Sequence, residues 1–152
     1  DSSRIYMWAH SNGGQIALSV LEISQAKIPT TLWAPVSKPF PYSILYYTDE
    51  FDDYCKALLL ELAKLEQDYD VNNFSISEYV DRIKAPIAIR QGTADIEVPL
   101  QWSDELVQNL KDHKIEVEYN VYPAADHNML GSWEKAIERD IRFFNNGGKV
   151  EE

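Results

Sequence analysis

The feature that most constrains the fold is the stretch WAHSNGG at residues 8–14, where an apolar segment runs into a serine flanked by small residues. The segment Ile5–Trp8 is a nearly continuous apolar run, which is typical of a strand covered on both faces. The glycines at 13 and 14 then open a segment with helical spacing. A serine between such a strand and such a helix lies at the tip of a tight turn, with its hydroxyl clear of the sheet.

The neighbours of Ser11 fit a strained turn of this kind. The turn requires small residues two positions before and two positions after the serine, and these positions hold Ala9 and Gly13. Glycine is usual at both, and alanine accepts a positive φ less readily, so Ala9 is a mild departure. The alternative interpretation is that Ser11 is only the N-cap of the helix and that the glycines are there by chance.

The chemistry of the turn depends on partners elsewhere in the chain. A serine hydroxyl is a poor nucleophile until a base removes its proton. The backbone N–H of Asn12 would lie at the N-terminus of the following helix, where it can donate to a developing oxyanion. The motif therefore predicts Ser11 as a nucleophile and Asn12 as an oxyanion donor, provided that a histidine and an acid follow.

Strand-like and helix-like segments alternate along the chain. The expected strands are residues 4–10, 30–36, 85–90 and 115–122. The expected helices are residues 13–24, 101–110 and 131–144, with one more helix inside residues 38–84. The last strand alternates in polarity and is expected nearer to an edge. This order predicts an α/β fold with a mostly parallel sheet of about four strands and helices on both faces.

The helices show which faces should be buried. Residues at helical spacing share one side of each helix. In the first helix these are Ile16, Ala17, Val20 and Leu21, and in the last helix they are Trp133, Ala136, Ile137 and Ile141. The third helix should turn Trp102, Leu106, Val107 and Leu110 inward.

Two loops supply the missing chemistry. Asp95 lies in the stretch QGTAD that follows the third strand, and His127 lies in YPAADH near the end of the fourth. Loops that leave the carboxyl ends of parallel strands meet at one edge of the sheet, where such folds place their sites. The order Ser11, Asp95, His127 is the order expected for a nucleophile on a strand-to-helix turn. The three residues are therefore predicted as a catalytic triad.

Other side chains compete for these roles. Glu97 is the second candidate for the acid, whereas Asp126 adjoins His127 in sequence and is expected to stabilise the loop. His10 is interpreted as a packing residue beside the turn. His113 is interpreted as a cation at a helix C-terminus. The three histidines lack the helical or cysteine-paired spacing of a metal site, so no metal is expected.

The region of residues 38–84 differs from the rest of the chain. It is rich in aromatic residues and contains a helix in which Leu58, Leu59, Leu62 and Leu65 share a face. It follows the second strand and should overhang the serine, as a lid-like helical insertion. Its aromatic side chains then shape a substrate pocket, or they pack as the core of the insertion. The predicted pocket residues are Trp33, Tyr42, Tyr46 and Tyr47.

Composition excludes several classes of partner. The 152 residues suffice for one core, and the formal net charge of −11 argues against nucleic acid and anionic membrane surfaces. No apolar run approaches the roughly 20 residues of a membrane span. The single cysteine, Cys55, cannot form an internal disulfide, which favours a cytoplasmic location. Its side chain is expected to be buried on the leucine-rich helix. No cofactor is expected.

The motifs together resemble a known family. The segment YVDRIKAPIAIRQGTADIEVP at residues 79–99, with HSNGG and YPAADH, is similar to the C-terminal part of the α/β-hydrolase catalytic domain of prolyl oligopeptidase-type serine peptidases. The resemblance covers nearly the whole chain except residues 38–74. It implies strands five to eight of an eight-stranded fold, with the second oxyanion donor supplied by earlier strands and, in the peptidases, a β-propeller before them.

The resemblance implies a function and leaves alternatives. It implies a serine hydrolase that cleaves peptide or small ester bonds through an acyl-enzyme, and related carboxylesterases share the same motifs. The other hypothesis is an inactive fragment or assembly module of a hydrolase. Its first strand would be an exposed apolar edge, so we expect a homodimer or association with the N-terminal half of the domain.

Overall fold

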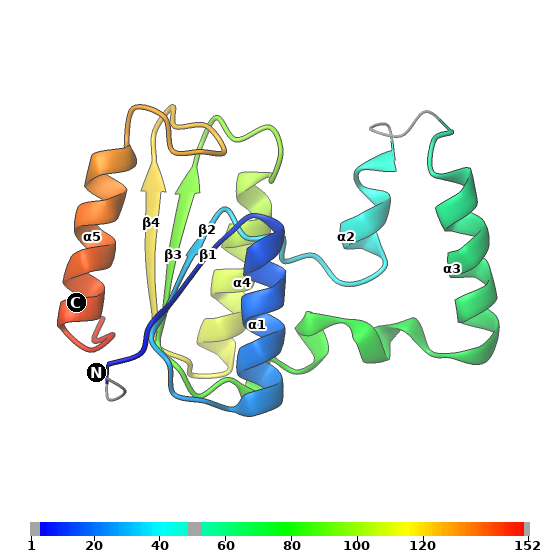
Figure 1. Cartoon of the computed structure of the whole chain (residues 1–152), viewed down its shortest axis with the longest axis horizontal. Helices are drawn as coiled ribbons and strands as arrows, with labels where there is room; N and C mark the ends of the chain where they lie inside the picture. The colour runs from blue at the N-terminus through cyan, green and yellow to red at the C-terminus, as the bar shows by residue number, and fades with distance from the viewer. Residues whose placement is uncertain (1–3, 49–52, 151–152) are drawn as a thin grey trace.

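The computed structural model describes residues 4–48 and 53–150, and its centre is a parallel sheet (Figure 1). Its four strands lie in chain order, and each neighbouring pair is parallel. They are β1 (Met7–His10), β2 (Thr30–Trp33), β3 (Ile87–Gly92) and β4 (Val117–Tyr122). A parallel pair needs a crossover connection, so the chain returns to the same end before each strand. The carboxyl ends of all four strands therefore lie at one edge of the sheet.

Helices cover both faces of this sheet, as the sequence predicts. Helices α1 (Asn12–Ser24) and α4 (Leu100–Asp112) lie on one face, and α5 (Trp133–Asn145) lies on the other (Figure 1). The larger core lies under α1 and α4, and a smaller one lies under α5. Every residue of β3 is buried, whereas β4 is mostly half-buried, which confirms its place at an edge.

Three strands are shorter than the sequence predicts; the fourth begins at Val117 instead of residue 115, and the first two differ more. The first begins at Met7 instead of Arg4, because pairing with β2 starts at Met7 opposite Thr30. The second ends at Trp33 instead of residue 36, because Ala34 has a φ of 41° and turns the chain out of the sheet. The chain after Ala34 then passes beneath the turn that holds Ser11, where Val36 N–H donates to the Ser11 carbonyl oxygen at 3.0 Å.

The buried face of α1 differs from the expected one. Ala17, Leu18 and Leu21 are buried, whereas Ile16 is 61% exposed and Val20 is 44% exposed. The spacing of apolar residues could not distinguish the buried side from the exposed side, because α1 is apolar around most of its circumference. One apolar side of the helix therefore faces outward among the described residues.

The inward face of α5 also differs, and a buried ion pair explains it. Trp133 and Ile141 are half-exposed, whereas Asp140 is buried beside Ala136. The Asp140 carboxylate accepts a bond from Arg90 Nε at 2.9 Å and from Trp33 Nε1 at 2.7 Å. Burial raises the pKa of Asp140, and the neighbouring Arg90 guanidinium opposes that shift. This ion pair fastens α5 to the centre of the sheet.

The region of residues 38–84 projects from the layers only in part (Figure 1), because Ile76, Val80 and Ile83 lie in the larger core. It contains α2 (Tyr42–Leu45) and α3 (Lys56–Asp68), and no residue of α3 is buried. Cys55 is buried as expected, but it precedes α3 instead of lying on it. The 3-10 turns η2 (Val71–Phe74), η3 (Ile76–Glu78) and η4 (Val80–Arg82) lead back to β3.

Residues 71–78 thus contain short 3-10 turns, and the lid-like role of the region stays a prediction. None of the helices among the described residues has the length and apolar character needed to cross a bilayer.

Glu22 is an unusual member of the core. It lies on α1 with 4% of its surface exposed, and its Oε1 has no hydrogen-bond partner among the described residues. Burial raises the pKa of Glu22 to about 8, partly offset by Arg82 and reinforced by Asp81. A folded-state pKa above the unfolded value means that the folded chain binds the proton more tightly. The stability that the proton provides is complete below about pH 4.5 and is lost as the pH rises toward 8.

We expect Glu22→Gln to stabilise the protein at alkaline pH. Above pH 8 the substitution should raise the free energy of unfolding by on the order of 2–4 kcal/mol, because it removes a buried negative charge. The difference should shrink toward pH 5, where Glu22 is neutral in the folded state. Urea unfolding across this range measures it, with the exposed Glu66→Gln as the control. A constant difference at all pH values would contradict the assignment.

Candidate active site

Ser11 lies in a strained turn between β1 and α1. Its φ is 56° and its ψ is −125°, which non-glycine residues rarely adopt. Hydrogen bonds on both sides of the residue hold this conformation: its N–H donates to the Trp33 carbonyl at 2.9 Å, and its own carbonyl accepts from Gly14 N–H at 2.9 Å. A strained backbone conformation of this kind persists only where contacts with the surrounding structure hold it, and such conformations are concentrated at functional sites.

Of the two glycines after Ser11, close contacts require the one at position 14 but not the one at position 13. A Cβ added at Gly13 would lie 3.8 Å from the Cβ of Ala9, so the two positions face each other at ordinary contact distance. Ala9 does not have a positive φ, so its departure from glycine causes no backbone strain. The tighter constraint is at Gly14, where a Cβ would lie 2.5 Å from Pro35. The sequence motif did not reveal this contact, because Pro35 is distant in the chain.

Asp95 is held in a fixed orientation at the end of β3. One carboxylate oxygen accepts the backbone N–H groups of Glu97 at 2.9 Å and Val98 at 2.8 Å. The other accepts Gln91 Nε2 at 3.0 Å and His127 Nδ1 at 2.9 Å. The carboxylate is fully buried. Four donors therefore fix both oxygens of Asp95.

A residue that sequence reasoning missed helps to orient this acid. Gln91 is buried, and besides Asp95 its Nε2 donates to the Val98 carbonyl at 3.1 Å, while its Oε1 accepts from Ser103 Oγ on α4 at 2.7 Å. These bonds fix which way the Gln91 amide points. A polar residue directly before the glycine of the predicted loop was the available sequence signal, but its direction depends on Ser103 in another element.

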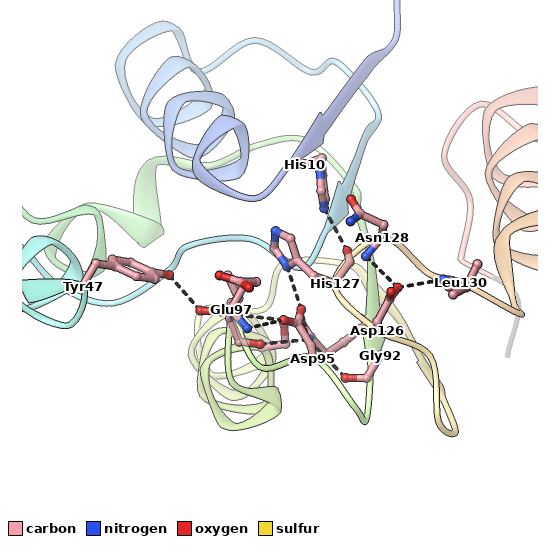
Figure 2. A network of polar contacts seen from close by, with 12 residues as sticks. His10, Tyr47, Gly92, Asp95, Glu97, Asp126, His127, Asn128 and Leu130 are labelled. Atoms are coloured by element: carbon pink, nitrogen blue, oxygen red, sulfur yellow. Dashed lines mark hydrogen bonds and ion pairs between the residues drawn. The ribbon is translucent and has the colours of Figure 1, made fainter. Parts of the chain in front are cut away.

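His127 Nδ1 bonds to Asp95 at the carboxyl end of the sheet (Figure 2). A carboxylate can only accept, so the bond to Asp95 places the proton of the neutral ring on Nδ1 and leaves Nε2 free to accept another. Ser11 and His127 line the same pocket, which has a volume of about 570 Å³. No hydrogen bond joins Ser11 Oγ to His127 within the part of the chain that the structure describes. The structure thus joins His127 to Asp95 and places Ser11 across the pocket.

The loops that carry these two residues are in direct backbone contact. Ala94 N–H donates to the Ala125 carbonyl at 2.9 Å, and Thr93 N–H donates to the Tyr122 carbonyl at 3.0 Å. A Cβ added at Gly92 would lie 2.2 Å from the Ala125 carbonyl oxygen. Only glycine allows this approach, so Gly92 sets the distance between the acid loop and the histidine loop.

The structure separates the predicted pocket residues. Tyr47 lines the pocket, and its hydroxyl donates to the Glu97 carbonyl at 3.1 Å. Trp33 does not line it, because this side chain is 1% exposed and packs against α5 in the smaller core. Tyr42 and Tyr46 are exposed outside it. The other lining residues are Asn12, Gln15, Val36, Ser43, Ile44, Glu97 and Asn128.

The competing candidates occupy other roles. The Glu97 side chain is exposed, whereas Asp126 accepts the N–H groups of Asn128 at 3.0 Å and Leu130 at 2.8 Å, which confirms its loop-stabilising role. His10 packs beside the turn as expected: its ring centroid lies 4.5 Å from that of His127.

His10 Nε2 also donates to the His127 carbonyl at 2.9 Å, a bond that the sequence did not indicate (Figure 2). His113 is the C-cap of α4, where its Nδ1 donates to the Asn109 carbonyl at 2.9 Å. Across the described ranges, no three His, Cys, Asp or Glu side chains gather in a way that could hold a metal.

Solved structures share this fold. The chain is similar to a puromycin-hydrolysing peptidase of Mycobacterium tuberculosis, with a TM-score of 0.74 and 20% identity over 99% of this chain and 23% of that one. The dipeptidyl peptidase 4 of Porphyromonas gingivalis has a TM-score of 0.69 and 21% identity, over 96% of this chain and 20% of that one. A monoacylglycerol lipase of Paleococcus ferrophilus has a TM-score of 0.65 and 16% identity, over 94% of this chain and 69% of that one. The chain thus spans about a fifth to a quarter of the two peptidases.

The family is shown by the sequence itself. Comparison with curated proteins gave no match. The profile of the prolyl oligopeptidase family, in contrast, matches residues 1–147, which is nearly the whole chain. The chain therefore belongs to the prolyl oligopeptidase family.

Proposed function

We propose that this chain carries the acyl-transfer groups of a serine hydrolase. The observation that carries the proposal is the bond between His127 Nδ1 and Asp95, with Ser11 on a strained turn lining the same pocket. Family membership supports the same reaction class. An N-cap role for Ser11 is less consistent with the structure, because its side chain makes no capping hydrogen bond to α1.

The reaction proceeds through an acyl-enzyme. Ser11 Oγ attacks the carbonyl carbon of the substrate while His127 Nε2 accepts the hydroxyl proton, and the carbonyl oxygen becomes an oxyanion. His127 then gives the proton to the leaving amine or alcohol. Asp95 keeps the imidazole oriented and stabilises its charged form. Water, deprotonated by His127, attacks the acyl group and releases Ser11.

The oxyanion needs donors that point into the pocket. Asn12 is the first residue of α1 and lines the pocket, so its backbone N–H is placed to be one of them. The second donor is proposed to come from a part of the complete hydrolase sheet beyond β1. One such donor is typically worth about 10²–10³ in rate. The chain of 152 residues is therefore expected to be a slow catalyst when assayed alone.

The substrate class is proposed to be a peptide or a small ester. The related structures include two peptidases and a lipase, and the same catalytic groups serve amide and ester carbonyls. An open pocket of about 570 Å³ with Val36, Ile44 and Tyr47 on its walls accommodates an acyl group of moderate size.

Ser11→Ala is expected to abolish covalent labelling by a fluorophosphonate probe. In the wild-type chain the Ser11 Oγ–P bond forms, the P–F bond breaks, and the hydroxyl proton goes to His127. Asp95→Asn should slow labelling by about 10²-fold or more, because the imidazole loses the partner that fixes its tautomer. Intact-mass spectrometry over a time course measures both rates.

The double variant Ser11→Ala with Asp95→Asn should resemble Ser11→Ala alone, because the groups act as a unit. Ser24→Ala, at an exposed serine that does not line the pocket, is a control that should react like the wild type. Labelling of Ser11→Ala at the wild-type rate would rule out the mechanism.

A second candidate function is assembly through the open side of β1. Along the outward side of α1, Ile16, Val20 and Ile23 follow one another at helical spacing, and Trp8 on the edge strand is 47% exposed. Apolar surface of this extent on an edge strand and its helix favours association. We propose that this face binds a second copy of the chain, as a two-fold dimer, when the remaining strands of a hydrolase sheet do not cover it.

The double variant Val20→Asp with Ile23→Asp should shift this association toward monomer. Two charges in the apolar face should weaken dimerisation at least about tenfold, because each would be desolvated in the interface. Sedimentation velocity over a concentration series measures the change, and Ile141→Asp on the far side of the molecule is the control. A wild-type chain that stays monomeric at high concentration would contradict dimerisation.

A further inference from the structure

An apolar groove is lined by residues of α2 and α3, the two helices that project from the layers (Figure 1). It has a volume of about 270 Å³. Its walls are formed by Phe40, Ile44 and Leu45 on the side of α2, and by Leu58, Leu62 and Leu65 on the side of α3. Because Leu58, Leu62 and Leu65 are spaced four and three residues apart, they form one face of α3 that is directed at α2.

This face is apolar but not buried. Leu58 is 37% exposed, and no residue of α3 is buried. A helix on the surface of a globular protein normally hides its apolar stripe against the core. Among the described residues, the leucines of α3 instead face the short α2 across the groove, which keeps apolar surface that a ligand could cover.

The groove adjoins the pocket of Ser11 at one residue, Ile44. Ile44 on α2 lines both, together with Ser11 and His127 on one side and with Leu62 on the other. A substituent attached to a carbonyl carbon at Ser11 that extends past Ile44 therefore reaches the groove. α2 is a single helical turn, so the path around it is short.

The charges at the groove select the chemistry of its occupant. Glu61 is the one charged residue on its walls, and Lys64 on the same helix pairs with it at 2.6 Å. Neither a carboxylate nor a phosphate would find a free cation on these walls. The part of a ligand that fits is therefore uncharged and apolar, with its polar end left at Ser11.

We propose that the groove between α2 and α3 binds the apolar tail of the substrate acyl group, beyond Ile44. This inference rests on the proposed function, because it takes Ser11 as the site of acylation. It narrows the substrate class to esters or amides whose acyl part carries an extended alkyl or bulky aliphatic chain. Short acyl groups fill only the pocket beside Ser11.

The test compares two fluorophosphonate probes, one with an ethyl chain and one with a decyl chain. The wild-type chain should react with the decyl probe about tenfold or more faster, because extra methylenes enter apolar surroundings. Leu62→Asp should remove this preference and leave the rate with the ethyl probe unchanged. Leu60→Asp is the matched control, because Leu60 lies on the same helix, is 64% exposed and does not line the groove.

A second measurement does not depend on the reactivity of Ser11. Titration of methyl-labelled protein with 1-decanol should shift the NMR signals of Leu58, Leu62 and Leu65 and leave Leu60 unchanged. Shifts in these methyl groups without labelling of Ser11 would refute the proposed function but retain the groove as a binding site for apolar chains.

Three results would overturn the groove as an acyl site. The first is an equal rate with the two probes when Ser11 reacts, and the second is a loss of preference in Leu60→Asp that equals the loss in Leu62→Asp. The third is dissociation of a dimer by Leu62→Asp with no methyl shifts from 1-decanol, which would assign the groove to a second copy of the chain.

Discussion

The site depends on a close approach of two backbones at the end of the sheet. Gly92 lies so near to Ala125 that even a methyl group would overlap the carbonyl oxygen of that residue. This contact lets the loop after β3 and the loop after β4 form hydrogen bonds with each other. As a result, His127 Nδ1 lies 2.9 Å from a carboxylate oxygen of Asp95. A parallel sheet places both loops at the same edge, but the glycine permits the final approach.

The molecule divides into a firmly packed part and an open part. The sheet, α1, α4 and α5 enclose two cores, and the ion pair of Arg90 with Asp140 ties α5 to the central strand. The acid and the histidine belong to this part, where many bonds fix them. In contrast, α2 and α3 contribute little to either core. One wall of the pocket is formed by Ile44 on α2 and by Tyr47 just after α2. In the proposed function, the packed part holds the acid and the histidine, and the projecting helices determine which substrates bind.

Sequence patterns predicted the parts of this architecture that depend on local order. Alternation of strands and helices indicated the parallel sheet, and loops after strands indicated where Asp95 and His127 would lie. What they could not indicate depends on contacts between distant residues. Trp33 was predicted to line the pocket, but its Nε1 donates to Asp140 and its side chain packs against α5. The outward side of α1 and the bond from His10 to the His127 carbonyl also depend on the tertiary arrangement.

Asp95 holds His127 through Nδ1, and the proposed mechanism needs the proton of the neutral ring on Nδ1 and a free Nε2 that can accept the proton of Ser11. The most direct measurement is the proton–nitrogen NMR spectrum of the His127 ring in the neutral form, for the wild-type chain and for Asp95→Asn. The account predicts a protonated Nδ1 and an unprotonated Nε2 in the wild type, with loss of this preference in Asp95→Asn. A wild-type ring protonated on Nε2, or identical spectra for the two proteins, would contradict it.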